Sequence, residues 1–420
     1  MMKPHKRKLG YWEELCQTGN DHYHGNGVIA AVAKFSYPTL SLKRFEEAVR
    51  LLQAQQPLLR AHVKKSTLNS HFIIDDSENA YLPFQVLVRD SDSMWESLIE
   101  LELNRPPRNQ DYQWRLILLH CESDIQHELI LISGHNIGDG ISIAYFFDSL
   151  FRIYEDLQTK NSFPIYPPVE KLLRHMDNKK TQPPEDFIMT PIPYENTTPL
   201  GGRVTKNIYH SFSSEHTKSL LDHCKYKDFS VNAFINAVTL VSLAKILKKE
   251  LSSTLHTPVN LRKWCQPEIP NDFFGCYVSV VTTYHHNINE HSNLDVLASN
   301  YERQLKNIRL PGDAIFPHQF NKQELLQQVA LWAGSSDHFS MGPTVTNIGL
   351  LPFNGQYDAL KWHTCYFCTS RQNADIPILL NVLTFNQKLM ICFTYTQPMM
   401  SKEFIQNYVA QFISYIDNVG

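Results

Sequence analysis

The chain has 420 residues, which exceeds the size at which one hydrophobic core usually stops growing, so we expect two domains. Hydrophobic residues make up 43% of the chain and charged residues 19%, a composition that excludes a disordered protein. The formal net charge is −3 and the basic residues are scattered, which argues against a nucleic-acid partner.

Targeting and membrane signals are missing from the sequence patterns. The basic start, MMKPHKRK, is not followed by the apolar run of a secretory signal. The most apolar long segment, VNAFINAVTLVSLAKIL, is shorter than the roughly 20 residues of a membrane span and contains Asn and Lys. The eight cysteines lack the spacing of a disulfide framework, which suits a reducing compartment. We therefore expect a cytoplasmic protein without a membrane span.

Helix-like and strand-like patterns alternate in the first part of the chain. Apolar residues at helical spacing follow a capping Ser41, and Pro57 ends this predicted helix. The runs WRLILLHCE at 114–122 and HELILISG at 127–134, joined by the polar SDIQ, predict an antiparallel hairpin. Apolar residues then fall on one stripe of ISIAYFFDSLFRIYEDLQ at 141–158, which predicts a helix packed over the sheet.

A proline-rich stretch at 166–203 has neither helical nor strand periodicity and is the best linker candidate. Strand-like and helix-like runs alternate again beyond it, without the steady rhythm of a dinucleotide-binding fold. The expected class is therefore α+β, with mixed sheets and helices. We expect an N-terminal subdomain at 1–165, a linker at 166–203 and a C-terminal subdomain at 204–420.

The polar insert HNIGDG at 135–140 stands between the predicted hairpin and the predicted helix. Histidine suits proton transfer at neutral pH, so His135 is a candidate general base for an alcohol or amine. Asp139 could pair with the imidazole, or it could turn away and fix the loop. Gly138 and Gly140 predict a tight turn that needs either a positive φ or a close approach of the backbone.

Other polar clusters predict little chemistry. Cys365 and Cys368 form a CxxC inside a strand-like run, and a zinc site needs a second ligand pair. His22 and His24 in DHYHGNG resemble half of a metal site, but no carboxylate completes it, so we expect no metal. The histidine pair at 285–286 is predicted to lie on the surface at a strand end. The sequence contains no phosphate-binding glycine loop and no GxSxG motif.

The insert resembles the HxxxDG signature of one acyltransferase superfamily. Its members include chloramphenicol acetyltransferase, nonribosomal peptide condensation domains, plant-type BAHD acyltransferases, alcohol acetyltransferases and polyketide-associated mycocerosyl-type acyltransferases. Further segments are similar in the same order along nearly the whole chain. They are LKRFEEAVRLL at 42–52, TPVNLRKW with Asn260 and Arg262, NDFFGCYVS with Gly275, and VTNIGLLP with Asn347 and Gly349.

The resemblance implies a specific fold and site. Two chloramphenicol acetyltransferase-like subdomains would form a pseudodimer, and a central tunnel would bring donor and acceptor to His135 from opposite faces. Asp139 would point away from the tunnel and pair with Arg262, with Gly140 shaping the loop. The role of Asp139 would be structural, because the ion pair would fix the position of His135.

Supporting roles in the site follow from the same resemblance. Asn260 and Gly275 belong to its structural segments. Asn347, with Thr344 and Thr346 beside it, is a candidate donor to the oxyanion of the reaction.

Two departures from the family pattern narrow the function. Condensation domains usually carry two successive histidines, and Gly134 replaces the first here, which favours transfer to oxygen. The element at 271–279 lacks the tryptophan of plant-type enzymes, so the sequence is most similar to the alcohol acetyltransferase and mycocerosyl-type branches.

The resemblance implies an acyltransferase that moves an acyl group from a thioester donor to the hydroxyl of a small molecule. The donor would be acyl-CoA or a phosphopantetheinyl thioester on an acyl or peptidyl carrier protein, with no bound cofactor. One alternative is a free-standing condensation enzyme that forms an amide in nonribosomal peptide or polyketide biosynthesis. A second alternative is a catalytically silent binding or scaffold protein with the same fold. We expect a monomer.

Overall fold

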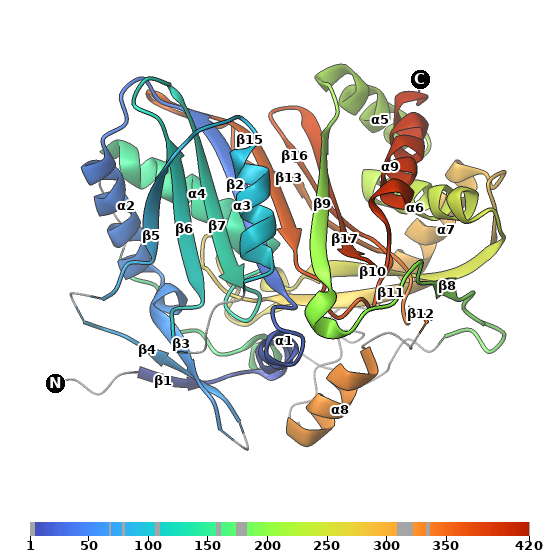
Figure 1. The fold of residues 1–420 in the computed structure, drawn as a ribbon, viewed down its shortest axis with the longest axis horizontal. Helices are drawn as coiled ribbons and strands as arrows, with labels where there is room; N and C mark the ends of the chain where they lie inside the picture. Colours follow the sequence, from blue (N-terminus) through green and yellow to red (C-terminus); the bar gives the residue numbers. More distant parts are fainter. Residues whose placement is uncertain are drawn as a thin grey trace.

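A computed structural model describes residues 5–66, 69–77, 80–105, 110–156, 161–173, 183–308, 322–332 and 337–419. Two six-stranded sheets lie side by side, each accompanied by helices (Figure 1). Both sheets are mixed, because each combines antiparallel with parallel pairs. The predicted α+β class is confirmed.

The first sheet carries the predicted hairpin and is covered by helices on both faces (Figure 1). Its strand order is β14 (Gln356–Tyr357), β15 (Leu360–Thr369), β2 (Val28–Ser36), β7 (Gln126–Gly134), β6 (Trp114–His120) and β5 (Phe84–Val88). The helices are α2 (Leu42–Gln55), α4 (Gly140–Asp156) and α3 (Met94–Leu103). α2 and α4 pack against each other on one face, where Phe35 of β2 meets Phe45 and Phe151. α3 contacts β2 and β7 from the other face.

Local signals place the ends of these elements as predicted. The Ser41 hydroxyl accepts a hydrogen bond from the Arg44 N–H at 3.3 Å and so caps α2. Pro57 follows the helix and begins a 3₁₀ turn, η1 (Pro57–Arg60). β6 and β7 pair antiparallel, and α4 starts directly after the polar insert. The strand, insert and helix around His135 are therefore confirmed.

The second sheet lies beside the first and is built around a central parallel strand. Its strand order is β11 (Val278–Ile288), β10 (Leu251–Asn260), β13 (Thr344–Leu350), β16 (Leu379–Phe385), β17 (Lys388–Gln397) and β9 (Val204–Ser211). Its helices are α5 (Ser214–Tyr226), α6 (Val231–Leu247), α7 (Leu294–Asn307) and α9 (Lys402–Asp417). α6 contacts α5, α7 and α9, and most of its side chains are buried. The Ser230 hydroxyl caps it as predicted, accepting from the Ala233 N–H at 3.1 Å.

Smaller elements complete the fold around the two sheets. They are β1 (His5–Lys8), α1 (Tyr11–His22), β3 (Ala61–Lys64), β4 (His71–Ile74), η2 (Val169–Lys171), β8 (Ile192–Pro193), η3 (Leu200–Gly202), η4 (Arg262–Trp264), α8 (Lys322–Trp332) and β12 (His338–Phe339). β1, β4 and β3 form a three-stranded sheet, and β8 pairs with β12.

The C-terminal part of the chain contributes to both sheets. β15 pairs with β2 of the first sheet, and β14 pairs with β15 at the edge of that sheet. The connection between β10 and β11, residues 261–277, also packs into the first hydrophobic core through Leu261, Phe273 and Phe274. The division at 1–165, 166–203 and 204–420 stays a prediction. The predicted linker is described at 166–173 and 183–203, and the rest of it lies outside the described residues.

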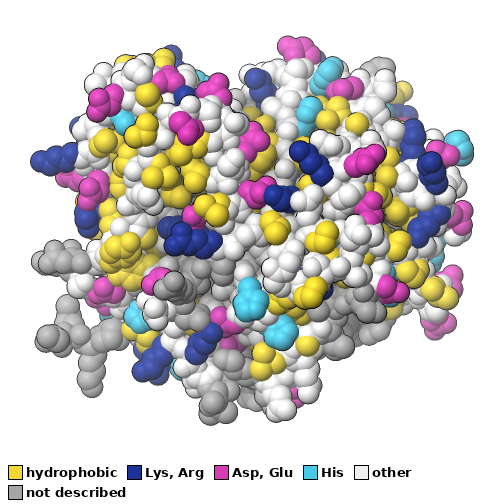
Figure 2. All heavy atoms as spheres, viewed as in Figure 1, with side chains coloured by type: hydrophobic (Ala, Val, Ile, Leu, Met, Phe, Trp, Pro, Cys, Tyr) yellow, Lys and Arg dark blue, Asp and Glu magenta, His cyan; other side chains and the backbone are white. Residues whose placement is uncertain are grey.

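Charged side chains of both signs are interspersed over the face shown in Figure 2. Among the described helices, no single one is long and apolar enough to cross a membrane. α5 and α6 reach that length and composition only as a pair bent by 102°.

One surface prediction is wrong. His285 is buried on β11, where its ring stacks on Tyr301 of α7 and its Nε2 lies 3.0 Å from the Thr283 hydroxyl. Only His286, its neighbour on the opposite face of the strand, is exposed. Burial lowers the pKa of His285 to about 4, so this ring is neutral at pH 7.

Candidate active site

His135 directly follows β7 and is held in place by the first sheet. Its backbone N–H donates to the Gly27 carbonyl at 3.0 Å, which extends the pairing of β7 with β2 by one residue. His135 is half-buried as a residue, whereas residues 136–139 of the same loop are buried. The backbone that carries the imidazole is therefore fixed.

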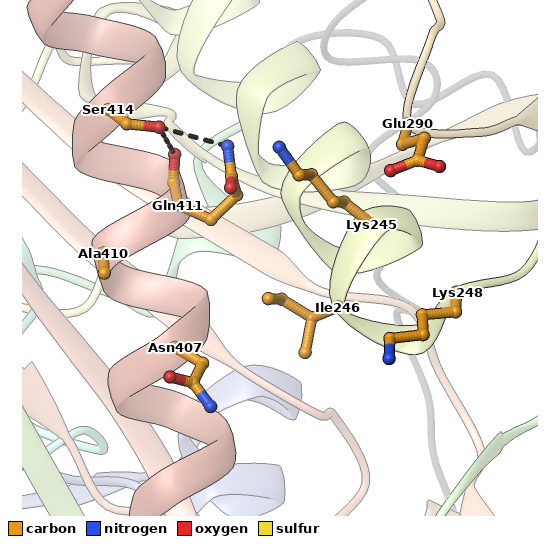
Figure 3. A pocket seen from close by; sticks show the side chains of 8 residues that line it. All are labelled: Lys245, Ile246, Lys248, Glu290, Asn407, Ala410, Gln411 and Ser414. Carbon is orange, nitrogen blue, oxygen red and sulfur yellow. Dashed lines mark hydrogen bonds between the residues drawn. The ribbon is translucent and has the colours of Figure 1, made fainter.

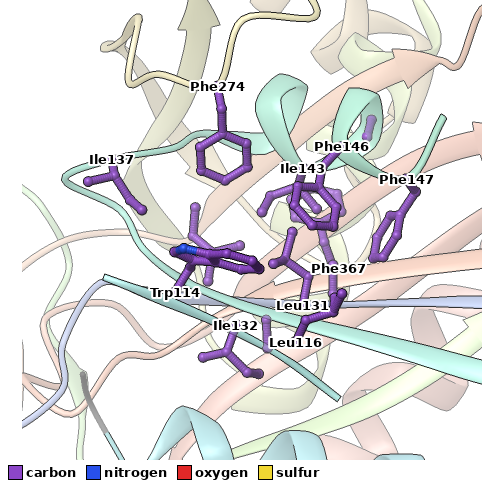
Figure 4. Close-up of a cluster of buried hydrophobic side chains, with 14 of the residues drawn as sticks. Trp114, Leu116, Leu131, Ile132, Ile137, Ile143, Phe146, Phe147, Phe274 and Phe367 are labelled. Carbon is purple, nitrogen blue, oxygen red and sulfur yellow. The ribbon is translucent and has the colours of Figure 1, made fainter. Parts of the chain in front are cut away.

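The loop rests on a tightly packed apolar cluster that both parts of the chain build. Figure 4 shows Ile137 beside Trp114, and Phe274 reaching the same cluster from the connection between β10 and β11. A Cβ on Gly138 would lie 2.6 Å from Cε1 of Phe274. Since Gly138 has no positive φ, its requirement is the close approach of Phe274.

Gly140 has the same kind of requirement on the other side of the loop. A Cβ there would lie 2.6 Å from Cγ2 of Ile348 on β13, and Gly140 likewise has no positive φ. Of the two alternatives left open by the sequence, close approach therefore applies to both glycines. The second sheet reaches the start of α4 at this point.

Asp139 forms the ion pair with Arg262 that the resemblance implied. Nη1 of Arg262 donates to Oδ2 at 2.7 Å, and Nη2 donates to Oδ1 at 3.0 Å, so the pair is bidentate. Both side chains are buried, and Arg262 has no exposed surface. Asp139 also precedes the first residue of α4, and its Oδ1 accepts from the Ser142 N–H at 2.9 Å, as an N-cap does.

A second ring of hydrogen bonds surrounds this ion pair. The Ser142 hydroxyl lies 3.1 Å from Oδ1 of Asp139, accepts from Nη2 of Arg262 at 2.9 Å and lies 2.8 Å from the Gly275 carbonyl. That carbonyl also accepts from Nη2 of Arg262 at 3.0 Å. The Tyr277 N–H donates to Oδ2 of Asp139 at 2.9 Å. The network joins the start of α4 to the segment at 261–277, which comes from the other part of the chain.

Charge in this network is balanced inside the protein. Burial alone would raise the pKa of the Asp139 carboxyl, but the Arg262 guanidinium and the hydrogen bonds from Ser142 and Tyr277 together hold it below its usual range. Asp139 is thus ionised at pH 7. Both of its oxygens are occupied by these donors, so the carboxylate does not reach the imidazole of His135.

The pKa of His135 is lowered, whereas a histidine paired with a carboxylate has a raised pKa. Burial lowers it below the usual value, against hydrogen bonding to backbone carbonyls and the attraction of Asp139, which act to raise it. The ring is therefore neutral at pH 7 and able to accept a proton. A thiol contacts it: Sγ of Cys276 lies 3.6 Å from Nδ1.

The remaining predicted residues lie around this centre with local contacts. Asn260 is exposed, and its side-chain oxygen accepts from the backbone N–H of Arg262 at 3.0 Å. Gly275 is buried, and a Cβ there would lie 2.5 Å from the Tyr277 ring. The side-chain oxygen of Asn347 accepts from the Gly349 N–H at 2.8 Å. Asn260 and Gly275 thus support Arg262, and Asn347 fixes its own turn on β13.

Sequence reasoning missed Ser142, Tyr277 and Cys276. Ser142 stands three residues after Asp139, the spacing at which a capping carboxylate binds the helix backbone, so a capping signal was present. Tyr277 and Cys276 make contacts with residues more than 130 positions away in the chain; Tyr277, for example, lies 138 residues after Asp139. No local pattern reveals such a contact.

In the described part of the chain, the motifs with possible metal ligands form no metal centre. There, no three His, Cys, Asp or Glu side chains are grouped as a metal ion would require. Cys365 and Cys368 lie buried in β15. A surface pocket of about 750 Å³ opens between α6 and α9, and Lys245 and Glu290 line it (Figure 3). The residues at 134–140 do not line this pocket, so it is separate from the His135 site.

Comparison with known proteins identifies the fold. No protein-family model matches the chain, and no curated protein matches it. The trichothecene 15-O-acetyltransferase of Fusarium sporotrichioides is 14% identical, with a TM-score of 0.77 over 99% of this chain and 95% of that one. Polyketide synthase associated protein 5 of Mycobacterium tuberculosis is 17% identical, with a TM-score of 0.68 over the full length of both chains. The starter condensation domain of rhizomide synthetase, a variant solved with C8-CoA, is 13% identical, with a TM-score of 0.66 over 98% and 94%.

The chain therefore has the chloramphenicol acetyltransferase-like fold, a pseudodimer of two subdomains that acyltransferases and condensation domains share. This confirms the fold implied by the sequence resemblance. Identities of 17% or less leave the reaction to be argued from the site.

Proposed function

We propose that this protein is a thioester-dependent acyltransferase with His135 as the general base. The observation that carries the proposal is the state of His135: a neutral imidazole on a half-buried residue, in a loop whose other members from 136 to 139 are buried. A base with a pKa below 7 is ready to take a proton at physiological pH and to return it afterwards.

The reaction follows from this placement. Nε2 of His135 takes the proton of an acceptor hydroxyl while the hydroxyl oxygen forms a bond to the thioester carbonyl carbon. The carbonyl oxygen becomes an oxyanion in the tetrahedral intermediate. When the intermediate collapses, the carbon–sulfur bond breaks and the imidazolium gives its proton to the leaving thiolate. The products are an ester and a free thiol, and His135 is again neutral.

Asp139 acts in this scheme as a positioning residue. Its oxygens are bonded to Arg262, Ser142 and Tyr277, so it fixes the loop between β7 and α4 and takes no proton in the reaction. Gly140 permits the approach of Ile348 that brings the second sheet against this loop. Correct placement of a base is worth a large rate factor, because small displacements weaken the reacting geometry.

Thr346 is better placed than Asn347 to donate to the oxyanion. Side chains alternate along β13 up to Asn347, where the register with β16 shifts, and Val345 packs in the core of the second sheet. Asn347 therefore shares the face of Val345, and Thr346 lies on the opposite face. We propose that the tunnel passes along this Thr346 face.

The donor in our proposal is acyl-CoA or a phosphopantetheinyl thioester, and a carrier protein is a partner in the second case. Two structural neighbours support thioester chemistry on this fold: one is a 15-O-acetyltransferase, and another was solved with C8-CoA. We propose a hydroxyl acceptor because Gly134 stands in place of the first of two histidines. Its Cβ would lie 2.5 Å from Oδ1 of Asn136, so a side chain there would require the buried Asn136 side chain to move.

Release of free thiol from a panel of acyl thioesters tests the proposal. The wild type is assayed with CoA donors and with acyl-loaded carrier protein, each with and without a mixture of alcohols and amines, and mass spectrometry identifies the products. We expect acceptor-stimulated thiol release and ester products. Amide products would instead establish the condensation alternative, and no release with either donor class would leave a silent protein with this fold.

A further inference from the structure

The two faces of the second sheet differ in polarity. On one face, Val345, Leu380 and Phe393 lie side by side and pack in the core beneath the helices. On the other face, the strand registers place one side chain from each of the six strands in a single row. These are Thr282, His256, Thr344, Leu379, Thr394 and Asn207. All but Leu379 are polar, so we call this side of the sheet the polar face.

The polar face is covered unevenly. β15 of the first sheet contacts β16 and β17 (Figure 1), and Asn381 and Thr394 are buried there. Beside β13 and β11 the cover is incomplete, because Thr344, Thr346 and Thr282 are only half-buried as residues. The open part of the polar face therefore begins at β13.

The strand β13 connects this open part with the loop that carries His135. Ile348 follows Thr346 by two residues, a span of about 7 Å in a strand. The Ile348 side chain packs so closely on Gly140, the first residue of α4, that a Cβ there would lie 2.6 Å away. The open part of the polar face thus borders the candidate active site.

Asn381 presents a buried oxygen without a hydrogen-bond donor. Its Nδ2 donates to the Cys392 carbonyl at 3.2 Å and to the Thr394 hydroxyl at 3.0 Å. Because a carbonyl only accepts, this contact fixes which end of the amide is the nitrogen. The other end, Oδ1, is buried and has no donor among the described residues. A buried oxygen in this state calls for a donor from a bound molecule.

Two free hydroxyl groups stand next to this oxygen. Thr346 lies directly across from Asn381 in the register of β13 with β16, and Thr344 is the preceding residue on the same face. Within the described part of the chain, neither hydroxyl has a hydrogen-bond partner. The Thr282 hydroxyl, in contrast, lies 3.1 Å from Nδ1 of His256. The unpaired groups of the polar face are therefore concentrated at β13 and β16.

The width of the open part indicates the shape of the molecule that it can hold. It extends over β11, β10 and β13, and two strand spacings measure about 10 Å. The pantetheine arm of a thioester donor is a single extended chain, which needs only a narrow passage. A face of this width suits a compact ring that presents several hydroxyl groups.

We propose that the polar face binds the acceptor and that the acceptor is a polyol, with several hydroxyl groups on one compact frame. Asn381 Oδ1 accepts from one of these hydroxyls and the Thr344 hydroxyl bonds another, while the reacting hydroxyl reaches His135. Asn381 and Thr344 are thus specificity-determining residues, and Thr346 is left for the oxyanion. This inference rests on the proposed function.

Three ring alcohols with the same carbon frame test the proposal: cyclohexanol, cyclohexane-1,2-diol and myo-inositol. Titration calorimetry measures their binding, and that of pantetheine, without any acyl donor. Acyl transfer to each alcohol gives kcat and KM. The variants are Thr344→Val, which keeps the shape of the side chain, and Asn381→Leu. Thr384→Val is the matched control, because Thr384 shares the opposite face of β16 with Leu380 and Val382.

We expect the wild type to bind the diol and inositol more tightly than cyclohexanol, by about three- to tenfold for each further hydroxyl that is bonded. Thr344→Val and Asn381→Leu should each remove one such factor by raising the KM of the polyols. The values for cyclohexanol and the KM of the donor should not change. Thr384→Val should match the wild type. Thermal unfolding checks that each variant is folded, and Thr344→Val alone suffices for the test.

Two results would overturn the proposal. One is equal binding of cyclohexanol and the polyols by the wild type, which would mean that only water meets these polar groups. The other is a loss in Thr344→Val that falls on pantetheine or on the KM of the donor, since the polar face would then hold the donor arm. A failure of the proposed function would show differently, as no thiol release by the wild type, and the binding measurements would still decide this inference.

Discussion

Breaking the Asp139–Arg262 ion pair should destabilise the protein far more than breaking a surface pair. Arg262→Gln removes the two bidentate hydrogen bonds at 2.7 and 3.0 Å and leaves a buried carboxylate with donors only from Ser142 and Tyr277. An uncompensated charge of this kind costs about 3 to 5 kcal/mol. Asp139→Asn should cost a similar amount, because it leaves the fully buried guanidinium unpaired.

Urea unfolding followed by tryptophan fluorescence measures this cost. With a slope of about 2.5 kcal/mol per molar urea, a loss of 3 to 5 kcal/mol lowers the midpoint by about 1 to 2 M. Arg50→Gln is the control: its ion pair with Glu46 is also short, at 2.9 Å, but about half of each side chain is exposed. An exposed pair contributes less than about 1 kcal/mol, so the control midpoint should barely move.

The double variant Asp139→Asn with Arg262→Gln gives the sharper test. It leaves no charge in the network, so it should lose about as much as one single variant, and the coupling energy should be about 3 kcal/mol. Additive losses from the two single variants would refute the reasoning. A midpoint for Arg262→Gln as high as that of Arg50→Gln would do so as well.

Two further predictions concern the loop and a buried histidine. Gly140→Ala should lower the thermal midpoint by an amount equivalent to about 1 to 3 kcal/mol, because its Cβ meets Ile348, whereas Gly201→Ala, with open space around it, should be neutral. His285 has a pKa of about 4 when folded and about 6.5 when unfolded, so the unfolded chain gains its proton first as the pH falls. Between pH 7 and pH 5 the wild type should lose about 2 kcal/mol more than His285→Gln in urea unfolding. An equal loss in both would contradict the burial of this ring.

The parts of the fold that rest on local patterns could be predicted from the sequence. Hydrophobic periodicity gave β6, β7 and α4, and capping serines marked where α2 and α6 begin, because these signals lie within a few residues of each other. No local pattern predicts that β15 joins the first sheet, because strand pairing across more than 300 residues leaves no local trace.

The residues of the candidate site also fall into those that a local pattern predicts and those that only the folded structure reveals. The residues of the polar insert alone identified His135 as a candidate base. The pairing of Asp139 with Arg262, which are 123 residues apart, was predicted only from the family resemblance. Cys276 could not be found by either route. Its contact with His135 depends on the connection between β10 and β11 packing into the first core, which is a property of the folded chain.

Acyl transfer by the wild type and by His135→Ala tests the central claim most directly. Both proteins are shown to be folded, and the mass of the acceptor and the release of thiol are followed in the same reaction. We predict that the wild type adds the acyl group to the acceptor and that His135→Ala loses this activity by at least about 100-fold. Equal acyl transfer by the two proteins would contradict the assignment of His135 as the base.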